Sequence, residues 1–218
     1  GLITTVAARI GGKTTYAFEG SVFNAGSTVQ WLRDSLGFFR SSSESEELAT
    51  SVPDNGGVYL VPAFTGLGAP YWKGNAKGLI TGLTRASTKA HVTRAALEAM
   101  AYSARDLIDT AAEESGVSIG ELRTDGGASA NNFLMEFQAN LLGIPVDRPA
   151  EQESTALGAA FLCGIGLGMI DPERLDEYRR REKVFYPDLS RESVQHYSRM
   201  YSGWKDAIRR CVYDGTDL

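Results

Sequence analysis

The stretch Leu122-Arg-Thr-Asp-Gly-Gly-Ala-Ser-Ala-Asn131 decides the fold. It predicts a short strand over residues 121–124, a turn through Gly126 and Gly127, and a helix that starts near Asn131. A strand, a glycine turn and a helix N-terminus together form a cradle for an anion or a nucleotide, because glycine has no Cβ and the first helical N–H groups are free. An ordinary tight turn is the alternative interpretation. The helix is indicated by apolar residues at 3.6-residue spacing, namely Phe133, Leu134, Phe137, Leu141 and Leu142.

Composition limits the classes of function. The chain has 218 residues, of which 43% are hydrophobic and 22% charged, and this suits one large or two small globular domains. A net charge of −5 argues against a nucleic-acid surface, and we expect the arginines at 179–181 to lie on a solvated, mixed-charge helix face. No apolar run approaches the ~18 residues of a membrane helix, so no membrane partner is expected.

Cysteine usage indicates a reducing compartment. Cys163 and Cys211 are far apart and form no C-x-x-C pattern, so we expect two small buried hydrophobic residues in a cytoplasmic protein. The two histidines, His91 and His196, offer no metal-ligand spacing. The chain has neither an initiator Met nor a signal peptide, and we expect it to be a piece of a longer protein.

The first hundred residues alternate between strands and helices. A hairpin is predicted over residues 2–9 and 14–18, and then a helix with Val22 and Leu36 on its apolar face and Gly37 as its C-cap. Gly26 and Gln30 lie one turn apart on this helix. A helical glycine costs roughly 1 kcal/mol relative to alanine, so close helix packing, the approach of a ligand or a cost that the fold simply tolerates should explain Gly26.

Further elements follow in the same alternation. Residues 58–61 and 78–83 are predicted strands, and the apolar loop 62–72 between them should pack against the core, a partner domain or a ligand. The longest predicted helix spans residues 88–115 and ends at Gly116. Capping boxes are predicted at Ser43 with Glu46 and at Ser118 with Glu121.

The last third predicts a strand over 145–148 and a small-residue helix over 155–167. Ser190 should cap a final helix. The fold class is therefore α/β, and the opening hairpin should make the sheet mixed. The side chains of the helix over 155–167 that should face inward are Leu157, Ala160, Phe161 and Ile165.

These motifs resemble one family. Gly78-Leu-Ile-Thr-Gly82-Leu83, His91-Val92 and Ala95-Ala-Leu-Glu98 are similar, with matching spacing, to the C-terminal pattern of the carbohydrate kinases that include glycerol, xylulose and gluconate kinases. The likeness covers nearly the whole chain and is weakest beyond Asp171. Four segments resemble glycerol kinases in particular: Gly20-Ser-Val-Phe-Asn-Ala-Gly-Ser-Thr-Val-Gln-Trp-Leu-Arg-Asp34, Pro62 through Trp72, Asp125-Gly-Gly-Ala-Ser-Ala-Asn-Asn-Phe-Leu-Met135 and Thr155-Ala-Leu-Gly-Ala-Ala160.

The resemblance implies an actin-like ATPase (ribonuclease H-like) domain, with a mixed β-sheet flanked by helices. Residues 1–218 would be the C-terminal, nucleotide-binding domain of a two-domain sugar or polyol kinase that uses ATP and Mg²⁺. Gly26 and Gln30 would contact the adenine side of the nucleotide from one wall, and Gly127 and Asn131 from the opposite wall. The full-length protein would be a cytoplasmic homo-oligomer, and glycerol would bind mainly to the absent N-terminal domain.

The resemblance places the catalytic residues outside this chain. The aspartate base, the glycerol-binding residues and a phosphate loop would lie upstream of Gly1, so no catalytic or metal-binding residue is expected here. Asp125 is more simply interpreted as a turn-stabilising residue. Lys73-Gly-Asn-Ala-Lys77 departs from the family pattern, which has an arginine in this segment. Whether this chain makes the contact that the arginine makes in relatives is therefore left open.

Two other kinds of function remain open. One is the same domain of a xylulose or gluconate kinase, and the other is a non-catalytic nucleotide-binding domain. A Rossmann dehydrogenase is disfavoured, because no G-x-G-x-x-G follows a predicted strand.

Overall fold

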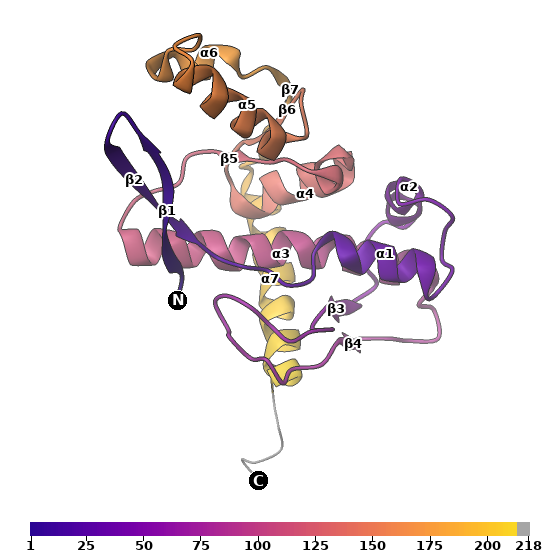
Figure 1. Ribbon diagram of the computed structural model, residues 1–218. Coiled ribbons are helices and arrows are strands. Elements are labelled where there is room, and N and C mark those ends of the chain that lie inside the picture. Colours follow the sequence, from indigo (N-terminus) through magenta and orange to yellow (C-terminus); the bar gives the residue numbers. More distant parts are fainter. Residues whose placement is uncertain (213–218) are drawn as a thin grey trace.

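The computed structural model describes residues 1–212, which are organised along one long helix, α3 (Lys89–Ser115). α3 crosses the middle of the molecule in Figure 1. It begins after Thr88, whose backbone N–H donates to Nδ1 of His91, and ends at Gly116 in the left-handed conformation. Its many alanines let neighbouring elements approach closely, and Ala96 and Ala99 are fully buried. The longest helix predicted from the sequence is therefore confirmed.

The strands form three small sheets rather than one. β1 (Ile3–Ile10) pairs with β2 (Lys13–Glu19), and β3 (Tyr59–Val61) pairs with β4 (Leu79–Thr81), both antiparallel. The third sheet is mixed, because β6 (Val146–Pro149) is parallel to β5 (Leu122–Arg123) and antiparallel to β7 (Arg181–Phe185). The prediction that the hairpin makes the sheet mixed was wrong. In the described chain β1 and β2 pair only with each other, and β7 supplies the antiparallel strand.

β7 replaces the helix face expected around the arginines at 179–181. Arg179 and Arg181 both form ion pairs with Asp147 of β6, whose side chain is fully buried, and the Arg181 Nε–Asp147 Oδ2 distance is 2.8 Å. A buried carboxylate needs positively charged partners, and Arg181 on β7 and Arg179 just before that strand provide them. The arginines at 179–181 therefore lie at the edge of the third sheet, where two of them pair with a buried carboxylate.

Two hydrophobic clusters flank α3. One joins α3 to α4 (Asn132–Leu142), α7 (Arg191–Val212) and β3, and its centre is Tyr102, which stacks on Trp204 with ring centroids 5.4 Å apart. The other joins the N-terminal half of α3 to α1 (Gly26–Asp34) and α2 (Glu44–Thr50). The apolar loop 62–72 packs against the core, since the hydroxyl of its Tyr71 donates to buried Asp106 at 2.7 Å.

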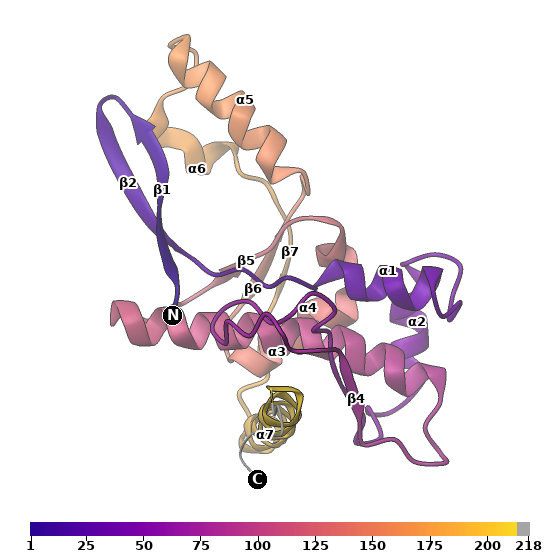
Figure 2. The same cartoon turned by 60° about the horizontal axis from the view of Figure 1, so that its bottom comes forward.

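α5 (Ser154–Gly166) projects from the body together with the short helices η2 (Pro172–Arg174) and α6 (Leu175–Tyr178), as Figure 2 shows. None of its residues is buried, and the predicted inward face is only partly confirmed: Leu157, Phe161 and Ile165 are half-buried, whereas Ala160 is exposed. Cys163 on this helix is exposed, and Cys211 on α7 is half-buried. The expected burial of both cysteines was therefore wrong.

Several predicted helix ends differ from the structure. α1 begins at Gly26 rather than near Val22, and its C-cap is Ser35 rather than Gly37. The two predicted capping boxes are absent: Ser43 makes no side-chain cap bond, and residues 116–121 contain no helical turn. Ser190 does cap α7, because its Oγ accepts the N–H of Ser193 at 3.3 Å.

Candidate functional site

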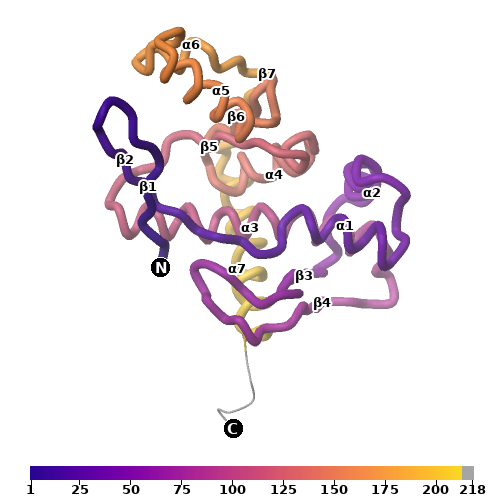
Figure 3. Tube along the Cα trace, viewed as in Figure 1, coloured from indigo at the N-terminus to yellow at the C-terminus, as the bar shows by residue number. Residues whose placement is uncertain are grey.

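The four residues predicted to bind a nucleotide lie around one cavity of about 400 Å³. Gly26 and Gln30 come from α1. Gly127 and Asn131 come from the short helix η1 (Gly127–Ala130) and the start of α4. Segments 26–46 and 127–134 meet at this cavity beside α3, and Figure 3 shows how the chain trace brings these regions together. Two walls about a hundred residues apart in the sequence therefore belong to one site.

Neither glycine is required by the protein's own packing. A Cβ added to Gly26 or Gly127 would meet no atom within 4 Å, and neither residue has the positive φ that favours glycine. Gly26 is also the first residue of α1 rather than an interior one, so the expected helix-interior cost does not arise. The alternative of close helix packing at Gly26 is thus excluded. Gly126, with φ of +76°, is the residue that makes the turn after β5.

Asn131 is the N-cap of α4. Its Oδ1 accepts the backbone N–H of Leu134 at 2.9 Å, which satisfies one of the free donors at the helix start. The side-chain oxygen is therefore engaged, and the amide NH₂ group remains to donate to a ligand. Gln30 is exposed at the cavity, and its amide makes no hydrogen bond to any described residue.

α2 supplies a third wall that sequence reasoning missed. Ser42, Ser43, Ser45 and Glu46 line the cavity, whereas the sequence predicts only a capping box at Ser43 with Glu46. Buried Ser45 donates through Oγ to the carbonyl of Ser42 at 2.6 Å. The spacing of Ser43 and Glu46 was the available signal, but Glu46 accepts the N–H of Asn132 instead of capping its own helix.

Arg94 of α3 holds the end of α2 and also forms a buried ion pair within α3. Nη1 of Arg94 donates to the carbonyl of Val52 at 2.8 Å, and its Nε donates to Glu98 at 2.9 Å. Glu98 also accepts from the side-chain amide of Asn55 at 2.8 Å. Burial raises the pKa of Glu98 to about 7, while Arg94 opposes that rise. The end of α2 and the turn after it are thus anchored to the core.

The charges at the cavity suit the uncharged part of a nucleotide. Glu46 is the one charged residue among those that line it in the described part of the chain, and no lysine or arginine does so. A phosphate group needs cations or free N–H donors around it. The serine hydroxyls, the amides and the aliphatic floor of Leu97, Met100 and Leu134 instead match a nucleoside.

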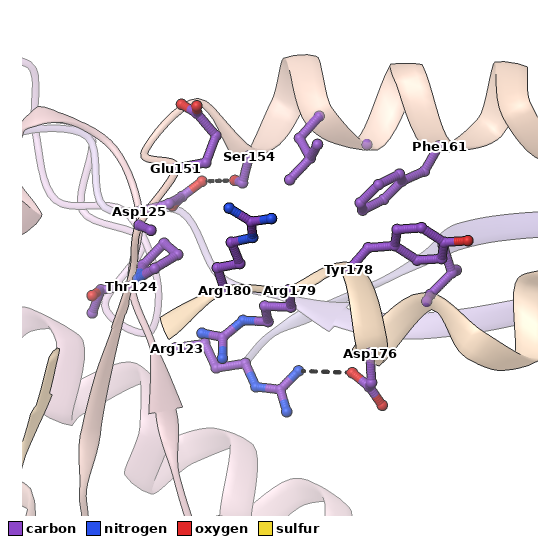
Figure 4. A pocket seen from close by; sticks show the side chains of 15 residues that line it. Arg123, Thr124, Asp125, Glu151, Ser154, Phe161, Asp176, Tyr178, Arg179 and Arg180 are labelled. Carbon is purple, nitrogen blue, oxygen red and sulfur yellow. Dashed lines mark hydrogen bonds and ion pairs between the residues drawn. The ribbon is translucent and has the colours of Figure 1, made fainter. Parts of the chain in front are cut away.

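A larger cavity, of about 740 Å³, lies between the third sheet and the α5–α6 region (Figure 4). Three arginines line it, but Arg123 faces Asp176 and Arg179 pairs with Asp147. Its outer wall is α5, which contributes no buried residue. None of the four residues predicted to bind a nucleotide lines this cavity. Its larger volume is therefore no reason to prefer it as the nucleotide site.

Asp125 lies at the larger cavity and bridges two elements. Its Oδ2 accepts a short hydrogen bond from the hydroxyl of Ser154 at the start of α5. This contact ties the end of β5 to α5, and the side chain of Asp125 makes no hydrogen bond within the turn in the described chain, so the turn-stabilising role expected for it is not seen.

Residues 1–212 contain no group of three or more His, Cys, Asp or Glu side chains that could hold a metal ion. Within the same residues, none of the helices has the length and apolar character needed to cross a membrane.

The chain is similar to a known protein family and to curated proteins. Residues 1–167 match the model of the C-terminal domain of the FGGY family of carbohydrate kinases. Glycerol kinase 2 of Thermotoga maritima is 50% identical over 213 residues, which are 97% of this chain and 42% of that protein. The glycerol kinase of Trichlorobacter lovleyi is 52% identical over 210 residues, 96% of this chain and 42% of that protein. The chain thus spans less than half the length of these relatives.

Solved structures show the same fold. The glycerol kinase of Plasmodium falciparum, determined with ADP, superposes with a TM-score of 0.87 at 30% identity, over 98% of this chain and 42% of that one. The xylulose kinase of Lactobacillus acidophilus superposes with a TM-score of 0.80 at 24% identity, over 98% and 42% respectively. These neighbours confirm the α/β, actin-like ATPase fold expected from the sequence.

Proposed function

The chain belongs to the FGGY family of carbohydrate kinases, as a C-terminal domain, and from that premise we propose that it is the nucleotide-binding part of an ATP-dependent glycerol kinase. The full-length protein would transfer the γ-phosphoryl group of ATP to glycerol and form glycerol 3-phosphate. The chain itself would hold the adenosine end of the nucleotide. The observation that carries the proposal is the cavity of about 400 Å³ at which Gly26, Gln30, Gly127 and Asn131 meet.

Each residue of the cavity has a defined part in this proposal. The two glycines leave open space where any side chain would obstruct a ligand lying against the backbone. The NH₂ groups of Gln30 and Asn131 donate to acceptors of the base or the ribose. Leu97, Met100 and Leu134 form an apolar surface for a flat ring, and the absence of lysine and arginine from the described lining directs the phosphates outward.

The chemical step would depend on residues outside this chain. Phosphoryl transfer needs a group that orients the attacking hydroxyl, donors around the γ-phosphate, and metal ions that neutralise charge. The described lining of the smaller cavity offers no cation to stabilise the γ-phosphate. Binding and orienting adenosine is therefore the contribution of residues 1–218 in this proposal.

The proposed two-domain organisation is supported by exposed apolar surface. Val6 and Tyr16 face each other across the β1–β2 hairpin and are 57% and 66% exposed, and α5 has no buried residue. Large exposed apolar patches mark interfaces. We propose that an N-terminal substrate domain completes the enzyme, which would act as a cytoplasmic homo-oligomer with Mg²⁺ bound to the ATP phosphates.

Glycerol is proposed as substrate because identity to curated glycerol kinases is about half over nearly the whole chain. The xylulose kinase structure at 24% identity supports the fold alone. The test is to supply the full-length protein with ATP and, separately, glycerol, xylulose and gluconate. Glycerol 3-phosphate should be the main product, and residues 1–218 alone should give no turnover.

Two results would contradict this proposal. Preferential phosphorylation of xylulose or gluconate would assign the domain to another kinase of the family. ATP binding without transfer to any polyol or sugar acid would indicate a non-catalytic nucleotide-binding domain.

A further inference from the structure

Glu46 is the one charged side chain at the smaller cavity in the described chain. The remaining lining residues are glycines, alanines, serines, amides and aliphatic side chains. A single carboxylate in such surroundings strongly affects which ligand atoms can approach, because it attracts hydrogen-bond donors and repels other anions. Neither the sequence patterns nor the family resemblance predicted that Glu46 lines this cavity.

The carboxylate of Glu46 is only partly used by the protein. Oε2 accepts the backbone N–H of Asn132, the first residue of α4, at 3.1 Å. Oε1 makes no hydrogen bond to any described residue. One oxygen therefore joins α2 to the start of α4, beside Asn131, and the other remains an acceptor at the cavity.

The helix that carries Glu46 is held firmly. Ser45, the residue before Glu46, is buried and donates a hydrogen bond to the carbonyl of Ser42. Arg94 fixes the residues after α2 through the carbonyl of Val52. A ligand would thus meet a carboxylate that is already positioned, and preorganised groups bind at lower entropic cost.

We propose that Glu46 is a specificity-determining residue of the nucleotide site. The inference rests on the proposed function and adds a third wall to it. Oε1 accepts a hydrogen bond from a donor of the nucleoside, either a ribose hydroxyl or the exocyclic amine of adenine. The negative charge also disfavours any pose with phosphates in the cavity.

The test compares binding of ATP, 2′-deoxy-ATP, 3′-deoxy-ATP and ITP to the full-length protein and to its Glu46→Gln variant. Hydrogen bonds to charged groups have net values that correspond to roughly a ten- to hundredfold change in affinity, so the variant should bind ATP weaker by about that factor. The analogue that lacks the contacted donor should bind the unmodified protein weakly. The variant should no longer distinguish that analogue from ATP.

Glu47→Gln is the matched control. Glu47 is the next residue of α2, is exposed and does not line the cavity. This variant should retain the affinity for all four nucleotides. Equal melting temperatures of both variants and the unmodified protein would exclude a general loss of folding.

The analogue that Glu46→Gln no longer distinguishes from ATP identifies the donor that Glu46 contacts. A deoxy analogue would identify the ribose hydroxyl that it lacks, and ITP would identify the exocyclic amine of adenine. Unchanged affinity and selectivity in Glu46→Gln would overturn the inference, and so would an equal loss for all four nucleotides, which indicates an effect through α4 alone. If the unmodified protein binds none of them, the proposed function fails as well. These outcomes are distinguishable.

Discussion

Asn131 combines two hydrogen-bonding roles in one amide group. Its oxygen caps α4 by accepting the N–H of Leu134, and its NH₂ group remains at the cavity. A sequence can show that an asparagine precedes a helix, but it does not show which end of the amide the fold uses. The structure resolves this: an alanine at position 131 would remove the helix cap and, on the proposed function, the donor to the nucleotide as well.

Replacing Asn131 by aspartate separates the two roles. Asn131→Asp keeps an acceptor for the Leu134 N–H, so the free energy of unfolding should change little, whereas Asn131→Ala should lose about 1 kcal/mol. Both variants lack the NH₂ donor and should bind ATP at least threefold more weakly, as expected for a lost hydrogen bond of about 1 kcal/mol. Chemical denaturation and calorimetric titration provide the two readouts. Undiminished ATP affinity in Asn131→Asp would exclude the proposed donor contact.

Glu98 should make stability depend on pH. Its pKa in the folded chain is about 7 against an ordinary value of 4.5, chiefly because of burial. The native state therefore holds this proton more tightly than the unfolded state, and stability is lost as the pH rises from about 4.5 to about 7. The loss from this group could reach about 3 kcal/mol.

The Glu98→Gln variant tests that dependence. Between pH 4.5 and 7.5 its unfolding free energy should decline less than that of the unmodified protein. Glu47→Gln, which removes an exposed carboxylate, should leave the original pH profile in place. Identical profiles for the unmodified protein and Glu98→Gln would show that this carboxyl does not titrate in the window.

At the scale of elements, Asp106 joins α3 to α7 and to the loop 62–72. Its carboxylate accepts from the hydroxyls of Tyr71 and Tyr201, from Nε1 of Trp204 and from Nζ of Lys205, at 2.5–2.8 Å. Asp106 is 3% exposed, so its charge is compensated almost entirely by these donors. The apolar loop is thereby part of the core.

Asp106→Ala should destabilise the protein by about 3 kcal/mol, because four buried or half-buried donors lose their acceptor. Asp109→Ala, one turn further along α3, removes only a half-exposed carboxylate paired with Arg105 and should cost less than about 1 kcal/mol. Urea denaturation of both variants measures the difference. Similar costs would mean that Asp106 does not hold α7 and the loop.

The long elements could be predicted because their patterns persist over many residues. α3 and α7 follow apolar 3.6-residue repeats, and Gly116 and Ser190 mark their ends. β7 could not be predicted, because arginine side chains in a strand depend on Asp147, a buried partner far away in sequence. The capping box at Ser43 failed for a related reason: Glu46 bonds to Asn132, 86 residues away.

The same limit applies to the site. Gly26, Gln30, Gly127 and Asn131 could be named from local patterns and family resemblance, and the structure places them at one cavity. The α2 wall could not be found, since serines and a glutamate in a polar connection are typical of ordinary surface segments. Only the tertiary arrangement shows which polar residues face a cavity.

At the scale of the whole molecule, the chain is a partial enzyme in this account. The two cavities described above differ in chemistry: the smaller has one carboxylate and an apolar floor, and the larger has three arginines under the projecting helix α5. On the proposed function, further protein would cover the exposed hairpin and α5. The account assigns the nucleoside to the smaller cavity and the chemical step to residues elsewhere in the full-length protein.

The most direct test is ATP affinity, measured by calorimetric titration, of full-length Gly127→Val and Gly158→Val. Each glycine lines one cavity, neither has a positive φ, and a Cβ added to either meets no atom within 4 Å. We expect at least a tenfold loss of affinity in Gly127→Val and a change below about twofold in Gly158→Val, a contrast of more than about 1 kcal/mol. The reverse result, or full ATP affinity in Gly127→Val, would show that the nucleoside does not bind in the smaller cavity.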